Sequence, residues 1–226
     1  MPTLLDRHVG DLVAEDFRRA RIFHQFGIDF CCGGGITVSE ACRRKHQDAS
    51  AVERALTELA GSAPDALSGV QSWSAAFLVD YIVSVHHTYV RESLPALRAF
   101  SAKVARVHGH ARPELVRVAE LVDRLGTEME AHLTLEETVI FPAIRTQDPL
   151  AYAHIVQAES DHEAAAGLVR ELRRITDGFQ APDWACNTYR ALYVNLAGFE
   201  RDLFTHVHLE NNVLFKRVRD TTAQTG

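Results

Sequence analysis

The sequence predicts an all-α protein: an up-down-up-down four-helix bundle with a small N-terminal helical domain. Sustained alternation of β-branched and polar residues is absent, so strands are not expected. Four long segments instead carry helical periodicity, and short connections join them, as in helix bundles. Small residues, Gly and Pro gather between the first 60 residues and these segments, which predicts a domain boundary there.

The N-terminal domain is expected over residues 1–60. Its helical stretches are interrupted at CCGGG, residues 31–35, because three successive glycines break a helix. The stretch GSAPDALSGVQ is typical of a linker, which we place at residues 61–72. The bundle is then expected over residues 73–220.

The four bundle helices are expected in order along the rest of the chain. The first spans about residues 74–107, with a broad apolar face formed by Phe77, Leu78, Tyr81, Ile82, Val85 and Tyr89. The second begins near Pro113, which suits a first helical turn, and continues to about Arg145. The third follows a turn at residues 147–149 and stops at Gly178. The fourth starts after Asp183, a suitable N-cap, and ends near Arg219.

Composition and charge narrow the class of protein. A formal net charge of −6 with scattered Lys and Arg leaves no basic stripe, so we expect no nucleic-acid partner. No apolar run is long enough for a bilayer and the N-terminus lacks a secretory core, so we expect no membrane partner and a cytoplasmic location. Cys31, Cys32, Cys42 and Cys186 are too few for a disulfide framework and are interpreted as reduced thiols.

One five-residue spacing occurs twice, as His132-Leu-Thr-Leu-Glu136 and His206-Val-His-Leu-Glu210. On a helix, positions i and i+4 share a face, so each motif presents an imidazole and a carboxylate together. These donors suit iron, manganese or zinc. Each motif alone also fits an exposed polar pair, but both occur on alternate helices and continue similarly, as EETVIFP and ENNVLFK. The repeat favours a site for two metal ions.

The first and third helices each offer further histidines, namely His86 or His87 and His154 or His162. Neighbouring helical residues lie about 100° apart, so only one of His86 and His87 can face the bundle axis. We select His87 and His162, although spacing alone does not decide between His86 and His87. Surface or ordinary hydrogen-bonding roles are expected for the remaining histidines: His8, His24, His46, His108, His110, His154 and His208.

Acidic residues near the motifs have two interpretations. Glu128, one turn before His132, is either a solvated helix residue or part of a polar channel to the metals. Solvated positions are expected for Glu92, Glu137 and Glu159.

Taken in order, these residues resemble a known family. The set comprises His87, His132-x-x-x-Glu136, Ser160-Asp161-His162 and His206-x-x-x-Glu210-Asn-Asn-Val-Leu-Phe, preceded by GIDFCCGGG. It resembles the repair-of-iron-centres di-iron family, the ScdA/YtfE-like proteins with a hemerythrin-like domain, over nearly the whole chain. Two positions depart from the family pattern. Asp161 stands where Glu is frequent, which affects an outer-shell or channel carboxylate, and Lys216 stands where Pro is common, which affects the helix end.

The resemblance implies a hemerythrin-like bundle that holds two non-haem iron ions with an oxo or hydroxo bridge. It implies that His87, His132, His162 and His206 are terminal ligands and that Glu136 and Glu210 bridge the irons, which selects His87 over His86. With four histidines, each iron would be about five-coordinate and keep an open position for nitric oxide or dioxygen.

The resemblance also implies a function. It implies repair of iron-sulfur clusters damaged by nitrosative or oxidative stress, by iron donation, with damaged iron-sulfur proteins or cluster scaffolds as partners. The alternatives are a nitric oxide reductase at the same centre and a di-iron redox or gas sensor. A homodimer is one assembly that the sequence leaves open.

Cys31 and Cys32 form a second candidate site, for redox chemistry or iron transfer. Adjacent thiols beside a glycine turn, with Arg43, Arg44 and Lys45 nearby, are expected to have a lowered pKa, exchange disulfides or hold iron transiently. The alternative is a buried pair beside a tight turn. A disulfide between sequence neighbours would be strained, and Cys42 is a candidate resolving partner.

Overall fold

The computed structural model describes residues 3–59, 67, 69–148 and 151–225. Within these ranges the secondary structure is helical, and only one isolated antiparallel bridge, between His8 and Thr37, interrupts that pattern. The predicted all-α class is confirmed. The chain divides into two compact units, residues 79–204 and residues 1–78 with 205–226. We call them the bundle unit and the terminal unit.

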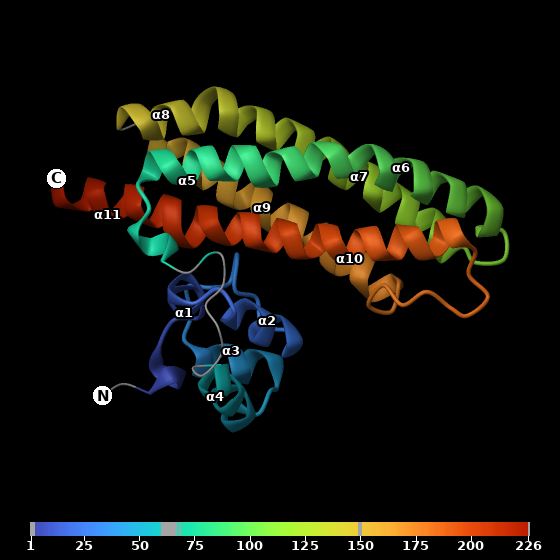
Figure 1. Cartoon of the computed structure of the whole chain (residues 1–226), viewed down its shortest axis with the longest axis horizontal. Helices are drawn as coiled ribbons and strands as arrows, with labels where there is room; N and C mark the ends of the chain where they lie inside the picture. Colours follow the sequence, from blue (N-terminus) through green and yellow to red (C-terminus); the bar gives the residue numbers. More distant parts are fainter. Residues whose placement is uncertain (1–2, 60–66, 68, 149–150, 226) are drawn as a thin grey trace. The chain divides into compact units, whose positions relative to one another are not determined.

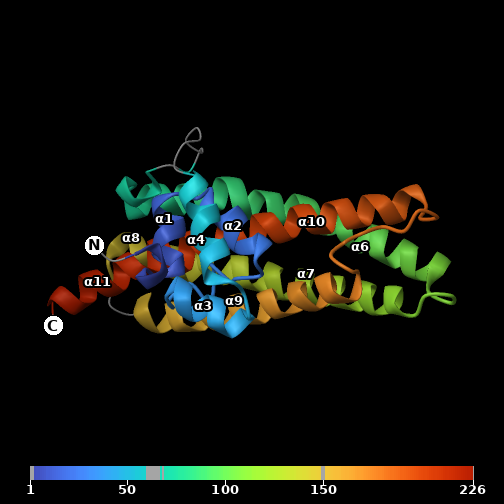
Figure 2. The same ribbon diagram turned by 90° about the horizontal axis from the view of Figure 1, so that it is seen from below.

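Four long helical segments make up the bundle unit and lie along one another (Figures 1 and 2). The first consists of the end of α5 (Ala75–Tyr81), η4 (Ile82–His87) and α6 (Thr88–His108). The second consists of α7 (Glu114–Leu135), η5 (Glu136–Ile140) and α8 (Phe141–Thr146). The third is α9 (Ala151–Ile175), and the fourth is α10 (Asn187–His208), whose last residues belong to the terminal unit. Short connections make the segments alternate in direction.

The bundle core follows from the spacing of apolar residues on α7. One face of this helix buries a series three or four residues apart: Leu115, Val118, Val122, Leu125 and Met129. This face packs against α6, and α7 also packs against α9. Burial of each such side chain contributes about 1.5–3 kcal/mol, so the helices are held mainly by this stripe.

The predicted start of the fourth helix is wrong. Asp183 does not cap it, because α10 begins at Asn187. Residues 182–185 form a turn in which the Ala185 amide donates to the Pro182 carbonyl at 2.9 Å. The Asp183 carbonyl accepts a hydrogen bond from Arg190 instead.

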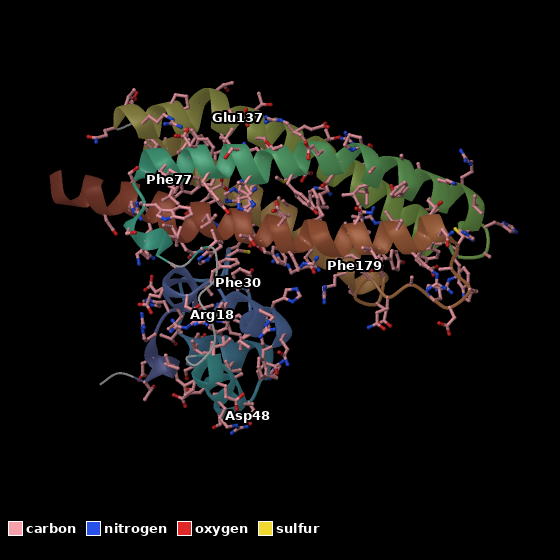
Figure 3. All side chains as sticks on the ribbon, in the orientation of Figure 1. Arg18, Phe30, Asp48, Phe77, Glu137 and Phe179 are labelled. Carbon is pink, nitrogen blue, oxygen red and sulfur yellow. The ribbon has the colours of Figure 1, made fainter. Side chains whose placement is uncertain are left out.

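Three segments of the structure are π-helical: η4 and η5 in the bundle unit and η6 (Leu209–Leu214) in the terminal unit. A π-turn closes its hydrogen bonds over one residue more than an α-turn, which rotates the residues that follow. The predicted apolar face is only partly buried: Leu78 and Ile82 are buried, whereas Phe77 (labelled in Figure 3) is 51% exposed and Val85 is 40% exposed. The π-turn accounts for Val85, which lies within η4, but not for Phe77, which precedes η4 on α5.

The terminal unit consists of short helices and the last part of the chain. Its elements are η1 (Leu4–Asp6), α1 (Val9–Glu15), α2 (Arg19–Gln25), α3 (Val38–Lys45), α4 (Ala49–Glu58), η3 (Val70–Ser72), η6 and α11 (Phe215–Thr225). Side-chain caps start two of them: Thr37 accepts from the Glu40 amide, and Asp48 (labelled in Figure 3) accepts from the Ser50 amide. Helix α1 packs against η3 and η6, so the end of the chain folds with its beginning.

The predicted domain bounds, 1–60 and 73–220, stay a prediction. The two compact units divide the chain at other places, after Leu78 and after Phe204. Most of the predicted linker, 61–72, lies outside the described residues. Among the helices that the structure describes, each is too short or too polar to span a membrane.

Candidate metal centre

Glu136 is the central residue of a cluster in the bundle unit. Its carboxylate is fully buried, and its two oxygens face different histidines. Oε2 lies 3.3 Å from His87 Nε2, and Oε1 lies 3.3 Å from His132 Nε2 and 3.8 Å from His162 Nε2. His132 Nε2 and His162 Nε2 are 2.9 Å apart. One carboxylate thus presents one oxygen to each of two groups of imidazole nitrogens.

The donor set of this cluster fits a metal site. Burial of an ionised carboxylate in an apolar bundle costs several kcal/mol unless a cation or hydrogen bonds compensate. The ligand atoms of His132, Glu136 and His162 all lie within 4.8 Å of one another. Imidazole nitrogen and carboxylate oxygen together suit iron, manganese and zinc. A cation between these atoms would compensate the buried charge.

Glu137 determines how His87 points. Its Oε1 lies 2.7 Å from His87 Nδ1 and accepts a hydrogen bond from Arg91 at 2.8 Å. Because Nδ1 is engaged there, Nε2 faces Glu136, as in metal sites whose histidines are held by an outer carboxylate. Partial burial alone would raise the pKa of Glu137, but the hydrogen bonds from Arg91 and His87 lower it. The prediction that Glu137 is solvated is therefore wrong.

The structure also separates the two adjacent histidines that spacing left open. His87 Nε2 faces Glu136, whereas His86 Nδ1 lies 2.9 Å from Asp202 Oδ1. Helical spacing contains no signal for this choice, because it depends on carboxylates that are distant in the sequence.

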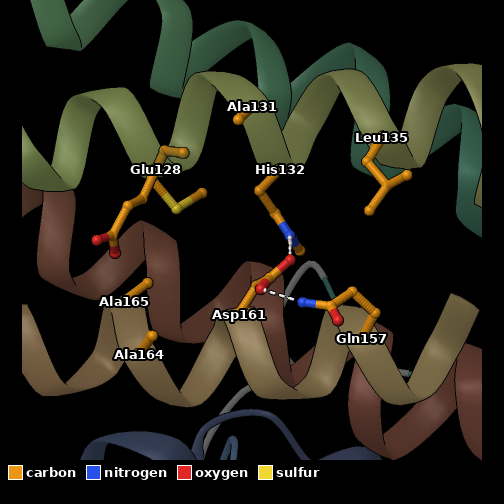
Figure 4. Close-up of a pocket in the computed structure, with 9 residues that line it drawn as sticks. Glu128, Ala131, His132, Leu135, Gln157, Asp161, Ala164 and Ala165 are labelled. Carbon is orange, nitrogen blue, oxygen red and sulfur yellow. Dashed lines mark hydrogen bonds and ion pairs between the residues drawn. The ribbon is translucent and has the colours of Figure 1, made fainter.

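A cavity of about 400 Å³ adjoins His132 between α7 and α9 (Figure 4). Its lining includes Glu128 and Asp161, the two residues predicted for a channel or outer shell. Asp161 Oδ2 lies 3.5 Å from His132 Nδ1, and its Oδ1 accepts from Gln157 at 2.8 Å. Glu128 pairs with Arg124 at 2.7 Å. Both carboxylate side chains are about one-third exposed, so solvent reaches this side of His132.

The second motif lies in the terminal unit. His206, on α10, places its Nε2 2.9 Å from Oε1 of Glu210, on η6, and both side chains are fully buried. The first motif is buried as well, so the interpretation of an exposed polar pair is wrong for both.

Residues next to Glu210 hold the CCGGG loop. Asn212 Nδ2 donates to the Cys31 carbonyl at 2.9 Å, and Asn211 Nδ2 donates to the same carbonyl at 3.4 Å. His208 Nδ1 lies 3.3 Å from the carbonyl oxygen of Phe30 (labelled in Figure 3). The expected ordinary hydrogen bond of His208 is present, but the residue is fully buried, and burial lowers its pKa to about 4. No local sequence pattern predicts either asparagine as a contact of the loop.

The predicted lowering of thiol pKa is wrong for Cys31. A hydrogen bond with Cys32, burial and the nearby Asp29 carboxylate raise its pKa well above the ordinary value. Arg43 and Arg44, which were expected to stabilise a thiolate, each bind Glu40 at 2.7 Å. Burial also raises the pKa of Cys42. Its role as a resolving partner stays a prediction.

A helical bundle that buries imidazoles around a shared carboxylate belongs to the class of metal-binding helical proteins. Comparison with known families makes this specific. Residues 78–218 match the hemerythrin HHE cation binding domain. Residues 5–60 match ScdA_N, described as a domain of unknown function, DUF542.

Curated relatives match nearly the whole chain. One is the iron-sulfur cluster repair protein ScdA of Staphylococcus haemolyticus, 34% identical over 92% of this chain and 96% of the relative. Two others are iron-sulfur cluster repair proteins YtfE. That of Pectobacterium atrosepticum is 36% identical over 94% of this chain and 96% of its own length. That of Edwardsiella ictaluri is 35% identical over 95% and 97%. The chain belongs to the ScdA/YtfE family of iron-sulfur cluster repair proteins, with a hemerythrin-like domain.

Proposed function

We propose that this chain repairs iron-sulfur clusters damaged by nitrosative or oxidative stress, and that it does so by donating iron. The observation that carries the proposal is the buried Glu136 carboxylate, whose two oxygens face His87 on one side and His132 with His162 on the other. A carboxylate that bridges two metal ions must present one oxygen to each ion, and the two Glu136 oxygens face different imidazoles in this way. The names of the relatives supply the reaction context.

In this proposal six residues hold two iron ions with an oxo or hydroxo bridge: His87, His132, His162 and His206 as terminal ligands, and Glu136 and Glu210 as bridges. One feature supports the set, because all six side chains are at most 4% exposed. Such a centre supplies exchangeable iron with open coordination positions.

The residues around the centre would control iron release. Glu137 holds His87 in place, so that side is expected to stay rigid. His132 instead adjoins the cavity that contains Glu128 and Asp161. Carboxylate oxygens are ligands for ferrous iron, and water can replace them on the metal ion. We therefore assign the release route to this cavity.

The partners in the proposal follow from iron donation. Recipients are damaged iron-sulfur proteins or cluster scaffolds in the cytoplasm, and nitric oxide or dioxygen are the small ligands of the open positions. No nucleic-acid or membrane partner is needed, and a homodimer is not required for the chemistry.

The test is a repair assay with purified components. Iron-loaded protein is incubated anaerobically with an iron-sulfur enzyme inactivated by nitric oxide, with a chelator present that removes free iron. We expect enzyme activity to return with the wild-type protein and with Glu92→Ala, an exposed control, and not with Glu136→Ala. Equal recovery with Glu136→Ala that carries no iron would contradict the proposal.

The same preparations address the two alternatives. A nitric oxide reductase would form nitrous oxide from nitric oxide repeatedly under reducing conditions, without losing its iron. A sensor would change its binding partners on oxidation without transferring iron. Retention of all iron during full recovery of the damaged enzyme would exclude donation.

A further inference from the structure

A second cluster of metal-ligating side chains lies in the terminal unit, where the CCGGG loop begins. It is formed by Asp29, just before the loop, and by Cys31 and Cys32. One ligand atom from each lies within 4.8 Å of the others. The two Sγ atoms are 3.8 Å apart, and Cys31 Sγ is 3.3 Å from Asp29 Oδ1. Both thiols are free. None of the three residues belongs to the proposed dinuclear centre.

The separation of the two sulfur atoms matches coordination better than a disulfide. A tetrahedral zinc-like ion with metal-sulfur bonds of about 2.3 Å places its two sulfur ligands about 3.8 Å apart. A disulfide would need the same atoms at about 2.0 Å and a dihedral that adjacent residues reach only with strain. The observed 3.8 Å is therefore already the distance that one tetrahedral cation requires.

Hydrogen bonds of the backbone, in addition to those of the sulfur atoms, hold the loop in this conformation. Asp29 Oδ1 accepts from the amides of Cys31, Cys32 and Gly33 at 3.1, 3.0 and 3.1 Å. On the other side of the backbone, Asn212 donates to the Cys31 carbonyl at 2.9 Å. A loop held at both points presents its thiols in a fixed geometry, and preorganised ligands bind metal ions more tightly.

We infer that Asp29, Cys31 and Cys32 form a mononuclear site for one thiophilic divalent cation, zinc or ferrous iron. Thiolates are the soft donors that these ions accept, and the carboxylate completes a tripod. Cys32 is partly exposed, so a fourth, solvent position is available. On binding, each thiol releases its proton to solvent and two sulfur-metal bonds form. No electron is transferred, and no oxidant or reductant is needed.

The site does not depend on the proposed repair function, because its ligands and geometry are its own. Asn211 and Asn212, which donate hydrogen bonds to the loop, directly follow Glu210 in the sequence.

The test uses cobalt(II) chloride as the probe on the reduced full-length protein. Thiolate-to-cobalt charge transfer gives an absorption that His and Glu ligands do not produce, so the readout is specific for thiolate ligands and the cysteine variants assign it to this loop. We expect one equivalent of cobalt to generate it, with release of two protons, and zinc or ferrous iron to displace the cobalt. Loss of the band is expected in Cys31→Ser and Cys32→Ser.

Further single variants distinguish the loss of a metal ligand from the loss of the folded structure. Asp29→Asn keeps an oxygen that can accept the three amide hydrogen bonds but removes the charge, and we expect at least a tenfold weaker cobalt affinity. Cys186→Ser and Cys42→Ser should behave as the wild type. Far-ultraviolet circular dichroism and the metal content of the His/Glu centre verify that each variant folds. The inference is overturned if the folded wild type gives no thiolate band, or if the band survives in the Cys31→Ser/Cys32→Ser double variant.

Discussion

The two H-x-x-x-E repeats bury equivalent side chains, yet the residues that follow each glutamate make different contacts. After Glu136, Glu137 binds Nδ1 of His87 at 2.7 Å. After Glu210, Asn211 and Asn212 bind the carbonyl of Cys31 at 3.4 and 2.9 Å. One repeat therefore supports the buried His87, and the other supports the thiol loop. The two repeats share the H-x-x-x-E spacing, whereas the residues that follow each glutamate have different roles.

The surroundings of the two repeats differ as well. His132 of the first repeat adjoins a cavity that contains Glu128 and Asp161. His206 and Glu210 of the second repeat are fully buried. The first repeat thus adjoins a cavity with two carboxylates, whereas the second lies beside the CCGGG loop.

The largest expected effect tests whether the repeats are equal as metal ligands. Glu136→Ala removes the carboxylate shared by three imidazoles, and Glu210→Ala removes its counterpart. We expect each variant to lose both iron ions, because neither repeat alone supplies enough ligands for a dinuclear centre. Elemental analysis of anaerobically loaded protein measures this, with the exposed Glu92→Ala as control. Full iron content in either glutamate variant would show that its repeat is not a ligand.

The next prediction tests the contrast between Glu137 and Asn211. Glu137→Gln weakens the carboxylate that orients His87, and loss of such a partner typically costs 10–100-fold in metal affinity. Asn211→Ala should leave the affinity within a few-fold, because Asn211 contacts the loop carbonyl. Competition with a chelator of known affinity measures both. Equal losses of metal affinity in the two variants would show that Glu137 and Asn211 do not differ in their support of the metal site.

A third prediction concerns the loop that the second repeat supports. A Cβ at Gly34 would lie 2.7 Å from the Phe30 carbonyl oxygen and 2.8 Å from Asn212 Oδ1, whereas a Cβ at Gly35 meets nothing within 4 Å. We expect Gly34→Ala to lower the free energy of unfolding by about 1–3 kcal/mol and Gly35→Ala to change it little. Urea unfolding of the metal-free variants measures the difference. Similar stabilities would show that Asn212 does not fix the loop.

The smallest expected effect concerns Lys216, which occupies the place of Pro142 in the first repeat. Lys216 Nζ binds Asp11 Oδ1 at 2.6 Å, which ties α11 to α1. Partial burial alone would raise the pKa of Asp11, but the hydrogen bonds and charges of Lys216 and His8 together outweigh it and lower the pKa. Because both side chains are over one-third exposed, we expect Lys216→Gln to cost less than about 0.5 kcal/mol.

The pH dependence of that cost has a defined sign. A lowered carboxyl pKa contributes stability above the unfolded-state value of about 3.9, and this contribution is lost as the pH falls through the folded-state value. The wild type and Lys216→Gln should therefore differ at pH 7 and converge as the pH falls below the folded-state pKa of Asp11. Urea unfolding at several pH values measures this. A difference that persists in acid would assign the effect to packing instead.

Much of the fold could be predicted because helices leave local signals. Apolar spacing located the long segments, and the pairs at i and i+4 placed imidazole and carboxylate on one face. The prediction that Asp183 caps the fourth helix is wrong, because a local turn formed by residues 182–185 precedes α10. Val85 is partly exposed, although it was predicted on the apolar face, because the periodicity assumes α-helical turns and η4 is π-helical. The ligand set as a whole came from the family resemblance rather than from periodicity.

The sequence by itself determined the all-α class, the two His/Glu pairs and the family. Each depends on local spacing or on matching motifs, which tertiary contacts do not alter. Tertiary contacts set three features that local spacing does not: His87 faces Glu136 while His86 faces Asp202, Glu137 binds Nδ1 of His87, and Asn212 binds the thiol loop. These contacts join residues 49 to 181 positions apart. Their partners are set by packing and by π-helical rotation, for which helical periodicity contains no signal.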